Sequence, residues 1–299
     1  LTLEPTARVA QIVADGRASI EQAEPAMAAV QANVVHNHGY LAADNVGVGK
    51  SREITLTIID LMERAKMAGR PRRLLVTTKS ADNIADLIDG EMLKAVLDGD
   101  PPGFEIVRVP DWKASKPKRG ETAFEPLPQH EHAIYVTDFA NLAPYRSALM
   151  EVGLHGIVGD EAHKFKNADA QVGATWQTLH ADIMSRVLRD EQAFAYFTAT
   201  PAQSVYDYQY LYGLRLWPID GFNEWTMVVT GQASEAQAAT VTAHTDHPTP
   251  LDPNAVDVVG GDTGGGDGTT STTGQQGGHE DVFASALTPE KGQNVATLM

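Results

Sequence analysis

The chain has 299 residues, of which 42% are hydrophobic and 21% are charged, so it can bury a sizeable core in one large or two ordinary domains. It contains no cysteine, which excludes a disulfide scaffold, a thiolate metal site and a cysteine nucleophile. The net charge of -16 excludes a basic protein that coats polyanions. No apolar run approaches the ~18 residues of a membrane span, and no signal-peptide pattern is present, so we expect a cytoplasmic protein.

The residues before position 234 alternate short apolar runs with longer amphipathic stretches, a pattern typical of α/β units around a mainly parallel sheet. Apolar side chains at three- and four-residue spacing predict one helix from Lys50 to Lys66, and a second is predicted from Asp82 to Leu97. Six strands are predicted in chain order: 40–43, 74–77, 105–109, 133–137, 156–159 and 193–197.

The residues from Ser234 onward form an acidic segment of low complexity. They hold nine acidic residues and one basic residue, whereas the residues before them hold 30 acidic and 22 basic ones. The segment is rich in Gly, Thr and Asp and has few side chains to bury, so it predicts a flexible C-terminal tail. A solvated tail or inserted loop without chemistry is its expected role.

The segment between the first predicted strand and the first predicted helix reads LAADNVGVGKSR, which suits a phosphate-binding loop. Gly47 and Gly49 would let backbone N–H groups turn toward phosphate oxygens. Lys50 would place its charge between the β- and γ-phosphates, and Ser51 would offer a hydroxyl to Mg²⁺. Asp44 stands where the strict motif has glycine, so a glycine turn with an incidental lysine remains an alternative.

Two adjacent carboxylates follow the strand predicted at 156–159. Asp160 is the candidate ligand of Mg²⁺ through a water molecule, and Glu161 is the candidate that orients and deprotonates the attacking water. Exposed acids that cap the next helix are the alternative. The two halves of the site lie about 110 residues apart, each at a strand end, and together predict phosphoryl hydrolysis more strongly than either alone.

Three segments resemble motifs of superfamily 2 helicases and translocases, and of their Swi/Snf branch in particular. They are DNVGVGKS at 44–51 (motif I), the DEAH box at 160–163 (motif II) and FTATP at 197–201 (motif III). A closer resemblance is to strawberry notch-type helicase-like proteins. It rests on the GVGK loop followed by a small residue and Arg, and on YLYGLRLW at 210–217 followed by Phe222 and Trp225.

The resemblance covers roughly Ser19 to Trp225 and implies one three-layer RecA-like P-loop NTPase lobe. We therefore expect an N-terminal extension at 1–18, an ATP-binding domain at 19–233 and a tail at 234–299 that leads toward a missing second lobe. The start at Leu1 and the lack of a second lobe predict a fragment, of phage or bacterial origin and poorly active by itself.

The resemblance also assigns roles to residues. Catalytic roles fall to Glu161, Asp160 and Lys50, and metal binding to Ser51 and Asp160. Nucleotide contacts fall to Gln22, Gly47, Val48, Gly49, Lys50, Ser51 and Arg52. Coupling between nucleotide and track falls to His163, Thr198 and Thr200, and nucleic-acid contacts fall to Thr78, Lys79, Thr137 and Asp138. A surface glutamine, a buried structural histidine and ordinary loop solvation are the alternatives for Gln22, His163 and the nucleic-acid set.

The implied function is that of a DNA-stimulated ATP hydrolase, the motor lobe of a helicase-like or translocating enzyme. Its cofactors would be ATP and Mg²⁺. Its partners would be DNA or RNA, held through the backbone, and a second lobe. The alternative is a catalytically weak, ATP-gated interaction or scaffold module of a larger phage or bacterial assembly. A kinase or GTPase with the same loop is disfavoured, because no base-specificity motif or acceptor lid is visible.

Overall fold

The computed structural model describes residues 3–43, 49–115, 124–166, 171–200, 211 and 214–216. In these residues six strands form one sheet in the order β1-β6-β5-β2-β4-β3, and every neighbouring pair is parallel. The strands are β1 (Tyr40–Ala42), β2 (Arg72–Thr78), β3 (Glu105–Arg108), β4 (His132–Asp138), β5 (Gly156–Asp160) and β6 (Ala193–Phe197). All six predicted strands are confirmed, with bounds that differ by no more than two residues.

Five of the helices in the described residues have six residues or fewer. The helices are α1 (Ala7–Ala14), α2 (Ile20–Val34), α3 (Lys50–Met67), α4 (Ala81–Ala85), the π-helix η1 (Asp86–Val96), α5 (Phe139–Leu142), α6 (Arg146–Glu151), the 3-10 helix η2 (Ala162–Phe165), α7 (Gln171–Arg186) and the 3-10 helix η3 (Arg189–Glu191). The single helix predicted from Asp82 is thus one turn of α-helix that continues as a π-helix. Within the described part of the chain, no helix has the length and apolarity to cross a membrane.

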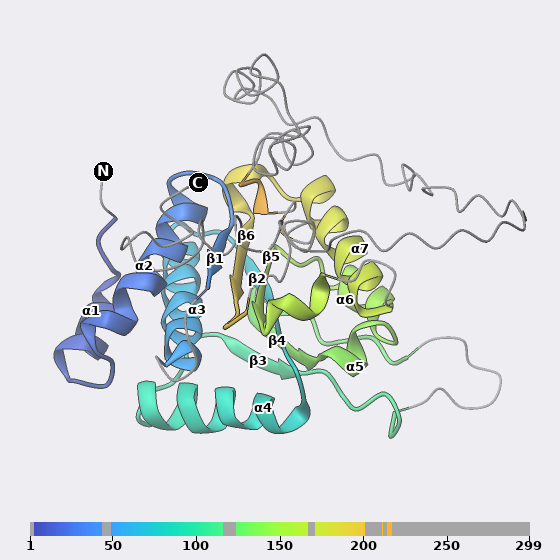
Figure 1. Cartoon of the computed structure of the whole chain (residues 1–299), viewed down its shortest axis with the longest axis horizontal. Helices are drawn as coiled ribbons and strands as arrows, with labels where there is room; N and C mark the ends of the chain where they lie inside the picture. The colour runs from blue at the N-terminus through green and yellow to red at the C-terminus, as the bar shows by residue number, and fades with distance from the viewer. Residues whose placement is uncertain are drawn as a thin grey trace, which may run out of the picture. The chain divides into compact units, whose positions relative to one another are not determined.

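The helices cover both faces of the sheet (Figure 1). On one face α1, α2, α3 and η1 bury a continuous core that includes Leu74 and Val76 of β2. On the other face α7 and η2 bring Trp176 and Phe165 against Tyr196 of β6, and the Trp176 indole N–H donates to the Tyr196 hydroxyl at 2.9 Å. The predicted three-layer α/β fold with a mainly parallel sheet is confirmed. The predicted tail lies outside the described residues.

The N-terminal residues contribute to this same core. Val9 and Ile12 of α1 are buried in it, and the backbone N–H of Thr6 donates to the carboxylate of Asp60 on α3 at 2.7 Å. Residues 7–14, which were expected in an N-terminal extension, therefore pack as part of the lobe. The close approach of β5 and β6 depends on Gly156, because a Cβ there would lie 1.9 Å from the carbonyl oxygen of Ala193.

Candidate nucleotide-binding site

The predicted site residues gather at one edge of the sheet, where all six strands end. Parallel strands place their carboxyl ends together, and ligands of such sheets bind in the loops beyond those ends. The carboxyl end of β1 lies beside that of β6, which in turn lies beside that of β5. Predicted motifs I, III and II follow these three strands, so the sheet order explains their convergence. Residues 44–48, which include Gly47 and Val48, lie outside the described residues.

Gly49 forms the N-cap of α3 in a conformation that side-chain-bearing residues rarely adopt, with φ at 98°. Its carbonyl accepts from the backbone N–H groups of Arg52 at 2.8 Å and Glu53 at 3.2 Å, which starts the helix. The 18-residue helix presents its positive dipole end to the loop. Lys50 is half-exposed there and Ser51 is exposed, so the structure leaves this helix start accessible to an anion.

The side chain of Gln22 on α2 lies directly against Gly49. A Cβ added to Gly49 would stand 2.3 Å from the Gln22 side-chain nitrogen, so the glycine leaves the space that this amide occupies. The amide oxygen of Gln22 accepts from the backbone N–H of Ser19 at 3.1 Å, which fixes the side chain at the start of α2. Gln22 is therefore held beside the start of α3 and is not simply a surface residue. Its predicted contact with adenine stays a prediction.

Arg52 takes part in a different contact from the one expected. Its guanidinium pairs with the carboxylate of Glu91 on η1, and both side chains are about one quarter exposed or less, at 27% and 21%. The ion pair ties the first turn of α3 to the π-helix. Arg52 thus has a structural partner in this conformation, and its predicted role in nucleotide binding stays untested.

Asp160 is the last residue of β5 and is held at both carboxylate oxygens. The Thr78 hydroxyl donates to one oxygen at 3.0 Å, and the backbone N–H of Glu161 donates to the other at 2.9 Å. Burial raises the pKa of the Asp160 carboxyl, while the Thr78 bond and the charge of Lys50 act in the opposite direction. Among the charges that act on this carboxyl, Lys50 comes from the other half of the predicted site, about 110 residues away in sequence.

Glu161 has a left-handed backbone with φ at 52°, which is uncommon for a residue with a side chain. Its carboxylate oxygen lies 3.2 Å from Nδ1 of His163, and one third of the side chain is exposed. The sharp turn after β5 therefore separates the two adjacent acids. Asp160 stays in the sheet edge, whereas Glu161 turns back over η2. Different environments for neighbouring carboxylates allow different roles.

His163 connects this turn to the loop after β6. Its Nδ1 also lies 2.9 Å from the Thr198 hydroxyl, which is fully buried. That hydroxyl accepts from the backbone N–H of Thr200 at 3.3 Å, and the Thr198 N–H donates to the carbonyl of Ala42 at the end of β1 at 3.0 Å. Desolvation lowers the pKa of His163, so the ring is neutral at pH 7. The three residues predicted to couple the motifs thus form one hydrogen-bonded chain.

The predicted nucleic-acid residues lie at the ends of β2 and β4 but are mostly not available at the surface. The side chains of Thr78 and Thr137 are fully buried, because strand neighbours and the helices that follow cover them. The Asp138 carboxylate accepts from the backbone N–H of Asn141 and caps α5. Of the four residues, only Lys79 has an exposed side chain. The prediction is therefore corrected for both threonine hydroxyls, which do not face a nucleic-acid backbone in this structure.

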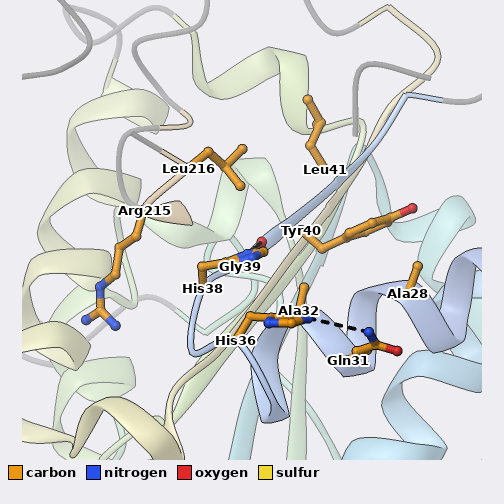
Figure 2. A pocket seen from close by; sticks show the side chains of 10 residues that line it. All are labelled: Ala28, Gln31, Ala32, His36, His38, Gly39, Tyr40, Leu41, Arg215 and Leu216. Carbon is orange, nitrogen blue, oxygen red and sulfur yellow. Dashed lines mark hydrogen bonds between the residues drawn. The ribbon is translucent and has the colours of Figure 1, made fainter. Parts of the chain in front are cut away.

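A cavity of about 330 Å³ lies elsewhere, at the amino end of β1 between this strand, α2 and residues 215–216 (Figure 2). Gln31 and His36 contact each other along its wall, with the two side-chain nitrogens 3.4 Å apart. The described residues contain no group of three or more His, Asp or Glu side chains that could hold a metal ion. A magnesium–nucleotide site does not require one, because phosphates and water supply most of its ligands.

The sequence reasoning missed the contact between Thr78 and Asp160. The only available signal was that two of the predicted strands are followed by a hydroxyl and a carboxylate. It also missed the pairing of Arg52 with Glu91, because the two residues lie on helices whose relative rotation no motif specifies.

No protein-family model matches the chain, and no curated protein matches it. A solved structure that is similar to it is described as "Sulfolobus solfataricus SWI2/SNF2 ATPase core in complex with dsDNA". The two are 18% identical with a TM-score of 0.48, and the match covers 82% of this chain and 46% of the other. This chain therefore spans less than half the length of that structure's chain.

Proposed function

We propose that the chain is the ATP-binding and ATP-hydrolysing motor lobe of a superfamily 2 helicase-like or DNA-translocating protein. The observation that carries the proposal is the convergence of Lys50, Asp160 and Glu161 at the carboxyl edge of one parallel sheet. Lys50 is the first residue of a long helix that follows β1, and Asp160 is the last residue of β5, so sheet topology brings the two to one edge although they are far apart in sequence. A cation, a helix N-terminus and a half-buried carboxylate at one edge fit the phosphates of a nucleotide and their metal ion.

The residues present fit Mg²⁺ bound with ATP. Ser51 and Asp160 offer the oxygen donors that Mg²⁺ prefers. Gly49 has no Cβ, which leaves room for the Gln22 side chain next to the start of α3. When bound, Mg²⁺ would offset the charge of the phosphates and favour departure of the terminal group. Lys50 would stabilise the same charge from the protein side.

Glu161 would orient and deprotonate the attacking water. Its backbone is left-handed, and its carboxylate oxygen lies 3.2 Å from Nδ1 of His163. In the neutral tautomer that carries the proton on Nδ1, His163 can donate to only one acceptor at a time, either Glu161 or Thr198. The loop after β6 would therefore influence how tightly Glu161 is held, which links the hydrolytic residue to its surroundings.

The nucleic-acid part of the proposal depends on Lys79, whose exposed side chain follows β2 at the same edge. An exposed lysine at a strand end suits a sequence-independent contact with a phosphate backbone. A second lobe would supply the arginine that stabilises the transition state, worth roughly 10³-fold or more in related systems. We therefore expect the chain to bind ATP and to hydrolyse it slowly.

Binding of a fluorescent ATP analogue with Mg²⁺, measured on the whole chain and on Lys50→Ala, tests the proposal. We expect Lys50→Ala to weaken binding about 10-fold or more, because it removes the phosphate-facing charge. Equal affinity of the two proteins would refute the nucleotide site. Lys79→Ala, assayed for binding to DNA at low and moderate salt, tests the track contact and should leave ATP affinity unchanged.

A further inference from the structure

The carboxylate of Asp160 has two defined hydrogen-bond donors within the described residues. One donor is the backbone N–H of Glu161, which every residue at that position except proline would supply. The other is the side-chain hydroxyl of Thr78, which depends on the residue type. Among these two donors, only the Thr78 hydroxyl can be removed by substitution, so this hydroxyl is the group to test for control of the carboxylate orientation.

The sheet places this hydroxyl. In the pairing of β2 with β5, Thr77 lies opposite Gly159, and the next residues along the two strands are Thr78 and Asp160. Thr78 has no exposed surface, so its hydroxyl is directed into the protein and not toward solvent. The exposed Lys79 follows at once, so the strand changes from a buried to an exposed side chain within one residue.

We propose that Thr78 is a positioning residue that fixes the Asp160 carboxylate for binding of the magnesium–nucleotide complex. This inference rests on the function proposed above. A hydroxyl that donates to one carboxylate oxygen fixes the directions of the remaining lone pairs of both oxygens. Without it, Asp160 keeps one donor and gains rotational freedom about its terminal bond, which a bound metal complex would have to remove.

The competing role for Thr78 is a direct contact with nucleic acid. The structure gives two reasons against it: the side chain is buried, and its only hydrogen that can be donated goes to Asp160. A contact with a phosphate backbone would require that bond to break. The two roles therefore predict opposite results for metal dependence and for nucleic-acid binding.

The test compares Thr78→Val with Thr77→Val in the full chain. Valine keeps the shape of threonine and removes the hydroxyl. The Thr77 hydroxyl is buried on the same strand without a hydrogen-bond partner among the described residues, so Thr77→Val is a matched control. The readout is binding of a fluorescent ATP analogue as a function of Mg²⁺ concentration, with binding in EDTA measured alongside.

We expect Thr78→Val to raise the Mg²⁺ concentration for half-maximal binding about 10-fold or more, the usual effect of losing a partner of a metal ligand. Binding in EDTA should not change, and Thr77→Val should behave like the parent. Should Thr78→Val fail to fold, Thr78→Ala and Thr78→Ser give the same comparison, because both lose the methyl group and differ only in the hydroxyl. We expect Ser to retain the parent's Mg²⁺ dependence and Ala to lose it.

The outcomes separate the two levels of inference. ATP binding that depends on Lys50, together with equal Mg²⁺ dependence of the Thr78 and Thr77 variants, would overturn the positioning role alone. A Thr78→Val protein that loses DNA binding and keeps the Mg²⁺ dependence of the parent would also overturn the positioning role alone. An absence of ATP binding that depends on Lys50 would overturn the proposed function and the positioning role with it.

Discussion

Replacement of Gly49 by alanine should disturb both the backbone and Gln22. The residue has φ at 98°, where an L-residue with a Cβ costs about 1 to 2 kcal/mol. The new Cβ would also stand 2.3 Å from the Gln22 side-chain nitrogen. That side chain can move away, but it would then give up the bond to the Ser19 N–H, worth about 0.5–1.5 kcal/mol. Together these terms predict a loss of about 1.5 to 3.5 kcal/mol in unfolding free energy.

Gly69 provides the matched control, because it has φ at 63° and a Cβ there would meet nothing within 4 Å. Gly69→Ala should cost only the backbone term, about 1 to 2 kcal/mol. Each kcal/mol corresponds to roughly 2–4 °C in Tm for a chain of this size, so thermal unfolding followed by circular dichroism resolves the two variants. In a Gln22→Ala background, which already lacks the bond to the Ser19 N–H, Gly49→Ala should cost only the backbone term. Equal costs for Gly49→Ala and Gly69→Ala, with the cost of Gly49→Ala unchanged in the Gln22→Ala background, would refute the reasoning.

Three further changes test packing elsewhere in the fold. His180 is buried, and its pKa is lowered to about 3 by desolvation first and by Arg215 second. The unfolded chain therefore binds one more proton at this residue than the folded chain below about pH 6.5, so the unfolding free energy falls with decreasing pH. Replacing His180 with leucine should make that fall shallower by about 1.4 kcal/mol per pH unit between pH 5.5 and 4.5, and parallel denaturation curves would contradict this. Asn33→Leu should lower the unfolding free energy by about 1–3 kcal/mol in urea, because it leaves the carbonyl and N–H of Phe194 unpaired; a change within 0.5 kcal/mol would count against it. Gly156→Ala should cost roughly 3 kcal/mol or more in the same assay, because its Cβ would overlap the backbone of β6, and a near-native midpoint would show that the strands can separate.

Much of the fold could be predicted because the buried strands are short apolar runs. Residues 193–197 and 156–159 are buried on both faces, so they read as continuous hydrophobic segments. Helix α7 was harder to recognise, since its buried face includes Gly173, Thr175 and His180, which are not typical core residues. The π-helical turns of η1 were not predictable, because the sequence pattern indicates a helix without its pitch.

The positions of the site residues could be predicted from the rule that parallel strands place their carboxyl ends at one edge. The contacts of these residues could not be predicted from that rule. The sequence indicated that Asp160 and Glu161 follow a strand, but the left-handed turn that separates them depends on packing of η2. The burial of the Thr78 and Thr137 hydroxyls depends on how far each strand continues beneath the following helix. Such one-residue differences decide whether a side chain contacts solvent or a neighbour, and no motif specifies them.

The most direct test of the central claim separates ATP binding from ATP hydrolysis at Glu161. Glu161→Gln keeps the size of the side chain and removes its ability to accept a proton. In single-turnover assays with Mg²⁺, we predict that the variant binds ATP with the affinity of the parent and hydrolyses it about 10²-fold more slowly or worse. Equal hydrolysis by the two proteins at equal ATP occupancy would contradict the assignment of this sheet edge as an ATPase site.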